Sequence, residues 1–186
     1  SLCFPSQFGC TQDVPTYDYN PEKAKKLLAE AGYPNGFETP FLAYRNRDYA
    51  EAMINNLNAV GITAKFEYLK YAAFRDKVQS GGAPFNFGTW GSYSINDVSA
   101  ITSHFQSGGK DDYSKDPEVI KQLGIGDTSV DANVRKAAYK AALSRISGEA
   151  FMFPLWPYNT WYAFSKDVDF NPTPDEIPRF FTAKWM

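Results

Sequence analysis

The sequence has few of the residues on which catalysis and metal binding most often depend. It contains one histidine, His104, and two cysteines among 186 residues. It has no Gly-x-Ser-x-Gly, Gly-x-x-x-x-Gly-Lys-Ser/Thr or His-Glu-x-x-His motif, which argues against the common serine hydrolases, P-loop nucleotide-binding proteins and zinc proteases. A single histidine on a helix is usually structural or solvated, and a nickel or haem ligand is the alternative.

Excess charge and long apolar runs are also lacking. Nineteen Lys and Arg stand against 21 Asp and Glu, giving a formal net charge of −2, so the chain has no basic stripe for nucleic acid. No apolar run approaches the roughly 20 residues that span a bilayer, and no signal peptide opens the chain. A signal that was removed, or that belongs to a preceding part, remains compatible with the sequence.

The two cysteines lie close together in the turn-rich segment CFPSQFGC. A disulfide between Cys3 and Cys10 would close a loop of ~8 residues and stabilise the fold by ~2–3 kcal/mol. We predict this disulfide, which fits an oxidising compartment outside the cytoplasm. Two reduced thiols are the alternative, and zinc is disfavoured because a four-ligand spacing is missing.

Residues 19–33 carry all the signals of one helix. Asn20 can cap the first turn, Pro21 suits the first helical position, and Gly32 can end the helix. Apolar residues recur at helical spacing, which predicts a docked surface helix. The residues on this expected buried face are Ala24, Leu27, Leu28 and Ala31.

Helical and strand patterns alternate along the rest of the chain. Residues 62–69 alternate with a period of two, which predicts a strand that buries Ile62, Ala64, Phe66 and Tyr68. Helices are expected near 49–60, 74–78, 98–105, 117 onward and 134–146, and aromatic strands at 85–90 and 151–164. This alternation predicts an α/β fold with a largely parallel or mixed sheet flanked by helices.

Several segments resemble one protein family. The segment YNPEKAKKLLAEAGYP is similar to the opening of the C-terminal lobe of family 5 extracellular solute-binding proteins, the dipeptide, oligopeptide and nickel receptors of ABC importers. Further similar segments are NNLNAVGI (55–62), Thr89–Gly91, Asp131–Arg135 with Tyr139, Phe153–Trp156 and the closing RFFTAKWM.

The resemblance covers the whole chain but only about the last third of such a receptor. It implies that residues 1–186 are a single C-terminal α/β lobe of a two-lobed periplasmic-binding-protein-like fold, with 1–19 and 166–186 as crossing or tail segments. The implied partners are a small solute, a missing N-terminal lobe and an ABC permease in the membrane. The implied location is periplasmic or anchored at the cell surface.

The best candidate site is Trp90-Gly91-Ser92-Tyr93 together with Asp97. An aromatic, a glycine and small polar residues at a strand end place backbone groups beside a stacking surface, where α/β folds bind ligands. Alternatively, Trp90 packs in the core and Asp97 caps the next helix. In peptide-binding relatives an aspartate two residues after this glycine pairs with the ligand's amino terminus, and here that position is Tyr93. The resemblance therefore favours a sugar, opine, metal complex or modified peptide over a plain peptide.

Three further residues are expected at the cleft. Tyr44 and Arg45 follow a predicted strand, and Arg45 can hold a carboxylate in a forked pair, although a solvated loop arginine is an equal alternative. Trp156 belongs to an aromatic group that suits either a surface between lobes or a core. The other members of this group are Tyr158, Asn159, Trp161 and Tyr162.

Three functions remain open. The first is a non-catalytic solute-binding lobe that delivers its solute to a permease. The second is a small extracytoplasmic hydrolase that uses Asp97, Asp111 or Asp112, although Asp111-Asp112 is expected to be a solvated loop pair. The third is a chemosensory receptor of the same fold. The absence of a nucleophile with a base weighs against the hydrolase and favours the first function. For that function we predict no catalytic residue, cofactor or metal ligand.

Overall fold

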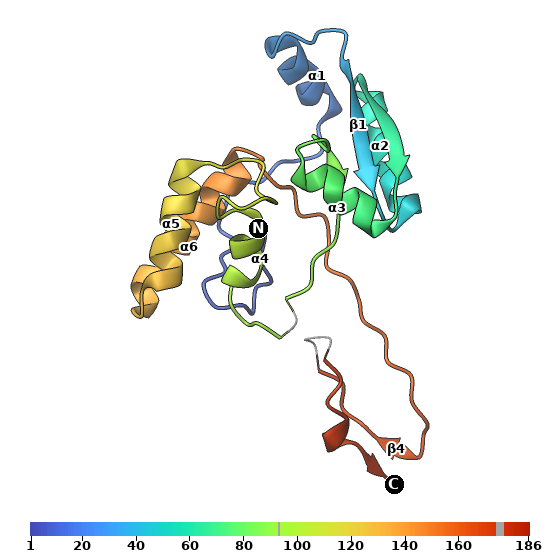
Figure 1. Cartoon of the computed structure of the whole chain (residues 1–186), viewed down its shortest axis with the longest axis vertical. Coiled ribbons are helices and arrows are strands. Elements are labelled where there is room, and N and C mark those ends of the chain that lie inside the picture. Colours follow the sequence, from blue (N-terminus) through green and yellow to red (C-terminus); the bar gives the residue numbers. More distant parts are fainter. Residues whose placement is uncertain (93, 174–176) are drawn as a thin grey trace. The chain divides into compact units, whose positions relative to one another are not determined.

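A computed structural model describes residues 1–92, 94–173 and 177–186 of the chain. These residues form two compact units, which are coloured along the sequence in Figure 1. We call Thr16–Trp90 the sheet unit, and Ser1–Pro15 with Gly91–Met186 the helical unit. That residues 1–186 make up a single lobe, with 1–19 and 166–186 as crossing or tail segments, stays a prediction.

The sheet unit is a small open parallel α/β fold (Figure 1). Its elements are α1 (Pro21–Glu30), β1 (Phe37–Ala43), α2 (Arg47–Ala59), β2 (Ile62–Tyr68), α3 (Tyr71–Gln79) and β3 (Asn86–Phe87). The strand order is β2-β1-β3, and β1 pairs in parallel with both neighbours. The predicted α/β class, with a sheet flanked by helices, is therefore confirmed.

The sheet unit has a core on each face of the sheet because neighbouring residues of β1 point in opposite directions. Phe41 and Ala43 pack with Ala50 and other residues of α2, whereas Leu42 packs with Phe74 and Val78 of α3. One helix thus covers each face. Because both faces are covered, the central strand β1 ends in three consecutive buried residues.

In its described residues the helical unit has three α-helices, α4 (Ser99–Phe105), α5 (Pro117–Thr128) and α6 (Ala132–Gly148). Asp116 caps α5 and Asp131 caps α6 through their carboxylates. Buried apolar side chains of α5, of α6, of Val98 just before α4 and of the N-terminal segment form one core. Its members are Leu2, Cys3, Val98, Val119, Leu123, Tyr139, Ala142, Leu143 and Ile146.

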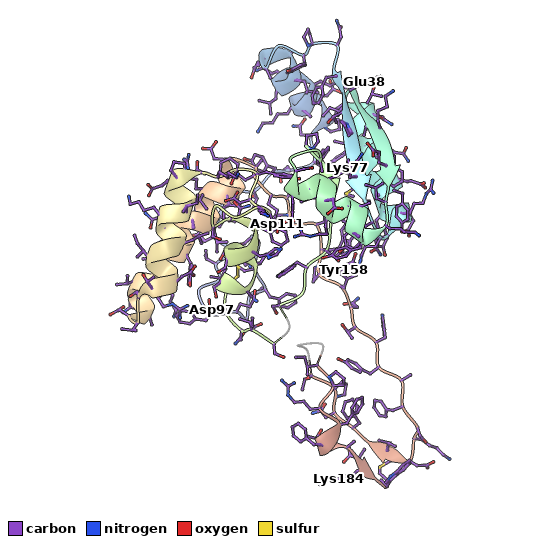
Figure 2. The ribbon with its side chains drawn as sticks, viewed as in Figure 1. Glu38, Lys77, Asp97, Asp111, Tyr158 and Lys184 are labelled. Atoms are coloured by element: carbon purple, nitrogen blue, oxygen red, sulfur yellow. A yellow bond between two sulfur atoms is a disulfide. The ribbon has the colours of Figure 1, made fainter. Side chains whose placement is uncertain are left out.

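The C-terminal part of the helical unit contains a second, separate sheet. In it β4 (Val168–Asp169) pairs antiparallel with β5 (Lys184–Trp185), and a 3-10 turn, η1 (Phe180–Thr182), lies between them in the chain. Lys184 of β5 is labelled in Figure 2. The antiparallel pairing therefore occurs outside the parallel sheet rather than within it.

Local predictions in the sheet unit were correct for chain conformation but less so for burial. Asn20 accepts a hydrogen bond from the Lys23 amide at 2.8 Å, as expected of a cap. The expected buried face of α1 was only partly correct, because Ala24 and Leu28 are half-buried but Ala31 is exposed and Leu27 is 53% exposed. In β2, Ile62, Ala64 and Phe66 are half-buried as predicted, but Tyr68 is 47% exposed because it ends an edge strand.

The predicted aromatic strand at 151–164 was wrong. Residues 153–165 are neither helix nor strand, and Phe153 and Trp161 are 64% and 88% exposed. A strand requires ladder pairing with a neighbouring strand, and in the described part of the chain this segment belongs to neither sheet. The other aromatic strand, expected at 85–90, shortens to Asn86–Phe87. Within the described ranges, no helix is sufficiently long and apolar to cross a bilayer.

Candidate ligand-binding site

The order of the strands places a topological switch point at the end of β1. The chain passes from β1 through α2 to β2 on one side, then through α3 to β3 on the other side. Ala43 and Phe87, the last residues of β1 and β3, are paired neighbours. Open α/β sheets bind ligands at the carboxyl ends of strands where the order reverses in this way. The loops that begin at Tyr44 and Gly88 therefore define the candidate site.

The two loops are in contact close to where they begin. The Tyr44 hydroxyl and the Thr89 Oγ1 are hydrogen-bonded at 3.1 Å. The Tyr44 ring also packs at 4.8 Å from the ring of Phe74 in α3, which fixes its orientation. We call Tyr44, Arg45, Thr89 and Trp90 the strand-end cluster.

Two side chains of the strand-end cluster, those of Arg45 and Trp90, are exposed. Arg45 is exposed and holds its guanidinium 4.8 Å from the centre of the Tyr44 ring. Trp90 is 43% exposed, so the alternative that it packs in the core is wrong. The cluster thus offers an exposed cation and aromatic surface. Sequence reasoning identified Tyr44, Arg45 and Trp90 but missed Thr89, whose position just before Trp90 was the available signal.

The remaining predicted site residues belong to the helical unit, so they are described separately from the strand-end cluster. Gly91 and Ser92 are half-buried, and Trp156 is 43% exposed. Tyr93 lies outside the described residues. Asp97, labelled in Figure 2, precedes α4.

Asp97 is engaged in structural contacts. Its Oδ1 accepts from the amide of Ser99, the first residue of α4, at 3.0 Å, and its Oδ2 accepts from the Arg135 guanidinium at 2.7 Å. Burial raises the pKa of Asp97, but the hydrogen bonds from Ser99 and Arg135 lower it by more. The pKa of Asp97 is therefore below its usual value. An ionised, paired carboxylate is a poor general acid or base at neutral pH.

Arg135 connects Asp97 to a buried tyrosine. Its Nη2 donates to the Tyr139 hydroxyl at 3.0 Å and its Nε donates to the Gly126 carbonyl at 2.9 Å. The Tyr139 hydroxyl donates in turn to Asp127 at 2.8 Å. Burial, opposed by the Arg135 bond, raises the pKa of Tyr139 to about 12. The arginine and tyrosine of the α6 motif therefore stabilise the helical unit.

The prediction that Asp111-Asp112 is a solvated loop pair was wrong. The Asp112 side chain is fully buried, and it accepts hydrogen bonds from the Gly108 and Lys115 amides and from the Ser114 hydroxyl. These bonds organise the loop between α4 and α5, and the unfavourable burial of the charge is offset by them.

Asp111 and His104 form a pair. The Asp111 side chain is 8% exposed and lies 3.4 Å from Nε2 of His104. In the part of the chain that the structure describes, no group of three or more His, Cys, Asp or Glu side chains is arranged to hold a metal ion.

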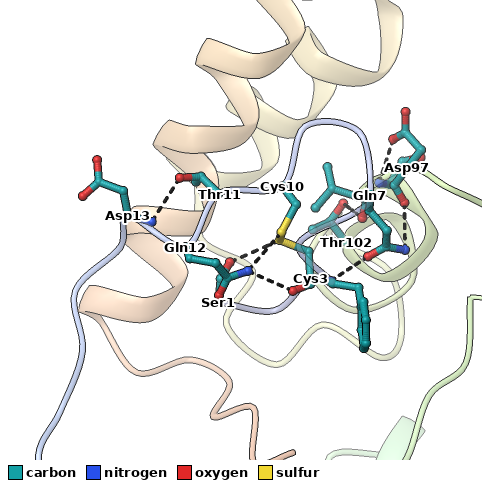
Figure 3. The surroundings of a disulfide bond; sticks show 12 residues. Ser1, Cys3, Gln7, Cys10, Thr11, Gln12, Asp13, Asp97 and Thr102 are labelled. Carbon is teal, nitrogen blue, oxygen red and sulfur yellow. Dashed lines mark hydrogen bonds between the residues drawn. A yellow bond between two sulfur atoms is a disulfide. The ribbon is translucent and has the colours of Figure 1, made fainter. Parts of the chain in front are cut away.

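The predicted disulfide is present. Cys3 and Cys10 are bonded to each other, and Figure 3 shows their surroundings. Cys3 is buried in the core of the helical unit. The bond therefore anchors the N-terminal segment to that core rather than closing an isolated surface loop.

The open parallel sheet and its strand order define an α/β protein, and comparison with known families identifies which one. The model of the middle region of bacterial extracellular solute-binding proteins, family 5, matches residues 1–112. The chain belongs to this family.

Three similar proteins illustrate the range of the family. The chain is 60% identical over 37 residues to haem-binding protein A of Haemophilus influenzae, a match covering 20% of this chain and 7% of that protein. It is 37% identical over 65 residues to the glutathione-binding protein of Escherichia coli, covering 33% of this chain and 13% of that protein. These matches are local.

A solved structure matches over the full chain. The dipeptide-binding protein of Pseudoalteromonas sp. SM9913, in complex with Met-Leu, is 23% identical with a TM-score of 0.76. The alignment covers 100% of this chain and 39% of that structure. At this identity the likeness shows the fold alone. The chain thus spans well under half the length of the relatives it matches.

Proposed function

We propose that the chain is the solute-binding lobe of a two-lobed ABC-importer receptor. It captures a peptide-like or other small solute outside the cytoplasm and delivers it to a membrane permease. A missing N-terminal lobe supplies the rest of the binding surface. The observation that carries this proposal is the strand-end cluster at the switch point of a chain that belongs to the solute-binding family.

The chemistry of the cluster favours a solute that bears a carboxylate. Arg45 is exposed beside an aromatic ring, and a guanidinium fork matches a carboxylate. A counter-charge for an amine is missing from the sequence between Trp90 and Asn96, and the nearest carboxylate, Asp97, is paired with Arg135. A modified peptide or another small carboxylate-bearing solute therefore fits better than a plain peptide.

A hydrolase is disfavoured by the same contacts. Asp97 and Asp112 are held in structural hydrogen bonds, and Asp111 is paired with His104. A chemosensory receptor of this fold would use the same solute site, so its separation from transport depends on the downstream partner.

Calorimetric titration of the intact receptor tests the proposal, with glutathione and Met-Leu as probes. Arg45→Ala should weaken binding of the better probe by about tenfold to a hundredfold, since hydrogen bonds between charged groups contribute roughly 1.5–3 kcal/mol. Arg47→Ala is the matched control, because Arg47 is exposed nearby in sequence but pairs with Glu51 within α2. Equal affinities of the two variants would contradict the proposed site.

A further inference from the structure

The loop closed by the disulfide lies against the segment that follows the predicted site residues Gly91 and Ser92. The Phe8 amide donates to the Asn96 carbonyl at 3.0 Å, and the Val98 amide donates to the Phe8 carbonyl at 3.0 Å. Phe8 and Asp97 thereby form an isolated parallel β-bridge. The backbone of Phe8 is thus paired with that of residues 96–98, far away in the sequence.

Gln7 adds side-chain bonds to the same segment. Its Nε2 donates to the carbonyl oxygens of Ile95 at 3.2 Å and Asp97 at 3.4 Å. Its Oε1 accepts from the Phe4 amide at 2.9 Å, which fixes the side chain within the disulfide loop. Gln7 and Asp97 are both labelled in Figure 3, where the bonds of Gln7 are drawn. One side chain therefore connects the disulfide loop to two carbonyls of residues 95–97.

The residue just before the segment contacted by Gln7 has an unusual backbone conformation. Ser94 has a φ of 71°, in the left-handed region that residues with a side chain rarely adopt. The Ile95 amide donates to the Ser92 carbonyl at 3.0 Å directly beside it. Such a conformation persists only where the surroundings hold it. The first carbonyl after Ser94, that of Ile95, is one that Gln7 binds.

We propose that Gln7 is a positioning residue for ligand binding. From the disulfide loop it holds the backbone of residues 95–97, which follow Gly91 and Ser92, two residues that the sequence predicts to contact the solute. This inference rests on the proposed function. It assigns a role to the N-terminal loop that the positions of the strand ends do not reveal.

The test compares Gln7→Ala with Gln12→Ala. Gln12 is a matched control because its Nε2 bonds to the Cys3 carbonyl at 3.2 Å and to Cys10 Sγ at 3.3 Å. Its amide thus stabilises the same loop, and neither of these two bonds reaches residues 95–97. Hydrogen exchange of the Ile95 and Val98 amides, together with the thermal midpoint, is measured in the full chain.

Gln7→Ala should exchange these amides at least tenfold faster than Gln12→Ala at the same thermal midpoint. In the intact receptor it should also weaken binding of glutathione or Met-Leu at least fivefold relative to Gln12→Ala. Equal exchange rates, or faster exchange with unchanged affinity, would overturn the inference. If the unmodified receptor binds no small solute, the proposed function fails, and the exchange comparison alone decides whether Gln7 holds the segment.

Discussion

Replacing Gly126 with alanine should destabilise the helical unit because of the ring beside it. An added Cβ at Gly126 would lie 2.5 Å from Cε1 and 2.9 Å from Cζ of the buried Tyr139 ring. The opposite side of that ring is blocked by Gly9, where an added Cβ would lie 2.4 Å from Cδ2. The ring therefore has little room to move away from either position.

Gly124 provides a control in the same helix, since nothing lies within 4 Å of its added Cβ. Alanine is favoured over glycine in a helix interior by ~1 kcal/mol, so Gly124→Ala should stabilise by roughly 0.5–1 kcal/mol. Gly126→Ala has the same gain. It also overpacks the core, at a cost of about 1–3 kcal/mol, and disturbs the hydrogen bond from Tyr139 to Asp127, which contributes ~1 kcal/mol. The net effect should be a loss of ~1–3 kcal/mol.

Urea unfolding of the two variants measures this difference. The free energy of unfolding should fall for Gly126→Ala and rise for Gly124→Ala, with similar dependence on urea concentration. Stabilisation by both substitutions would show that Tyr139 can move, and the tight packing around its ring would be refuted.

Three further outcomes are expected. Thiol titration of the unreduced, denatured protein should find no free thiol, and reduction of Cys3–Cys10 should lower stability by ~2–3 kcal/mol; two free thiols would contradict the disulfide. Hydrogen bonding from Arg145 lowers the pKa of Asp116 to about 2, so the stability this carboxylate contributes is present above its unfolded pKa and lost as the pH falls toward 2. The stability difference between the native chain and Asp116→Asn should shrink over that range, and a constant difference would count against the ion pair. Leu123→Ala in the core should cost ~2–5 kcal/mol, whereas Leu27→Ala on the exposed face of α1 should cost much less; comparable losses would mean that α1 is docked.

Elements defined by local signals could be predicted from the sequence. Asn20 and Pro21 placed the start of α1, and the period-two alternation placed β2 to within a residue of its observed end. Burial was harder to predict, because it depends on what covers a face. The apolar stripe of α1 is only partly covered, since Leu27 and Ala31 stay exposed, and residues 153–165 form no strand although their aromatic pattern suits one.

The candidate site was predictable only in part, for a similar reason. Tyr44, Arg45 and Trp90 follow strand patterns, so their place at strand ends could be inferred. The bond between Tyr44 and Thr89 joins residues that are 45 positions apart in the sequence. The bond from Gln7 to the Ile95 carbonyl joins residues that are 88 positions apart. Such pairs follow from the strand order and the disulfide, and no local sequence pattern predicts them.

Buried carboxylates were the clearest failure of local reasoning. Adjacent aspartates in a polar loop suggest a solvated pair, yet Asp112 is buried by bonds to the loop's own amides. Whether a loop folds back on its own side chains depends on backbone geometry that composition does not specify.

The measurement that tests the central claim most directly is calorimetric titration of this chain and of the intact receptor with the same solute, glutathione or Met-Leu. A two-lobed receptor buries its solute between lobes, so a lobe alone lacks part of the contacts. Losing about 4 kcal/mol of contacts weakens binding by roughly a thousandfold. We expect the intact receptor to bind and this chain to show at best millimolar-range affinity. Comparable affinities would place the whole site within these residues, and no binding by the intact receptor to any small solute would contradict the solute-binding function itself.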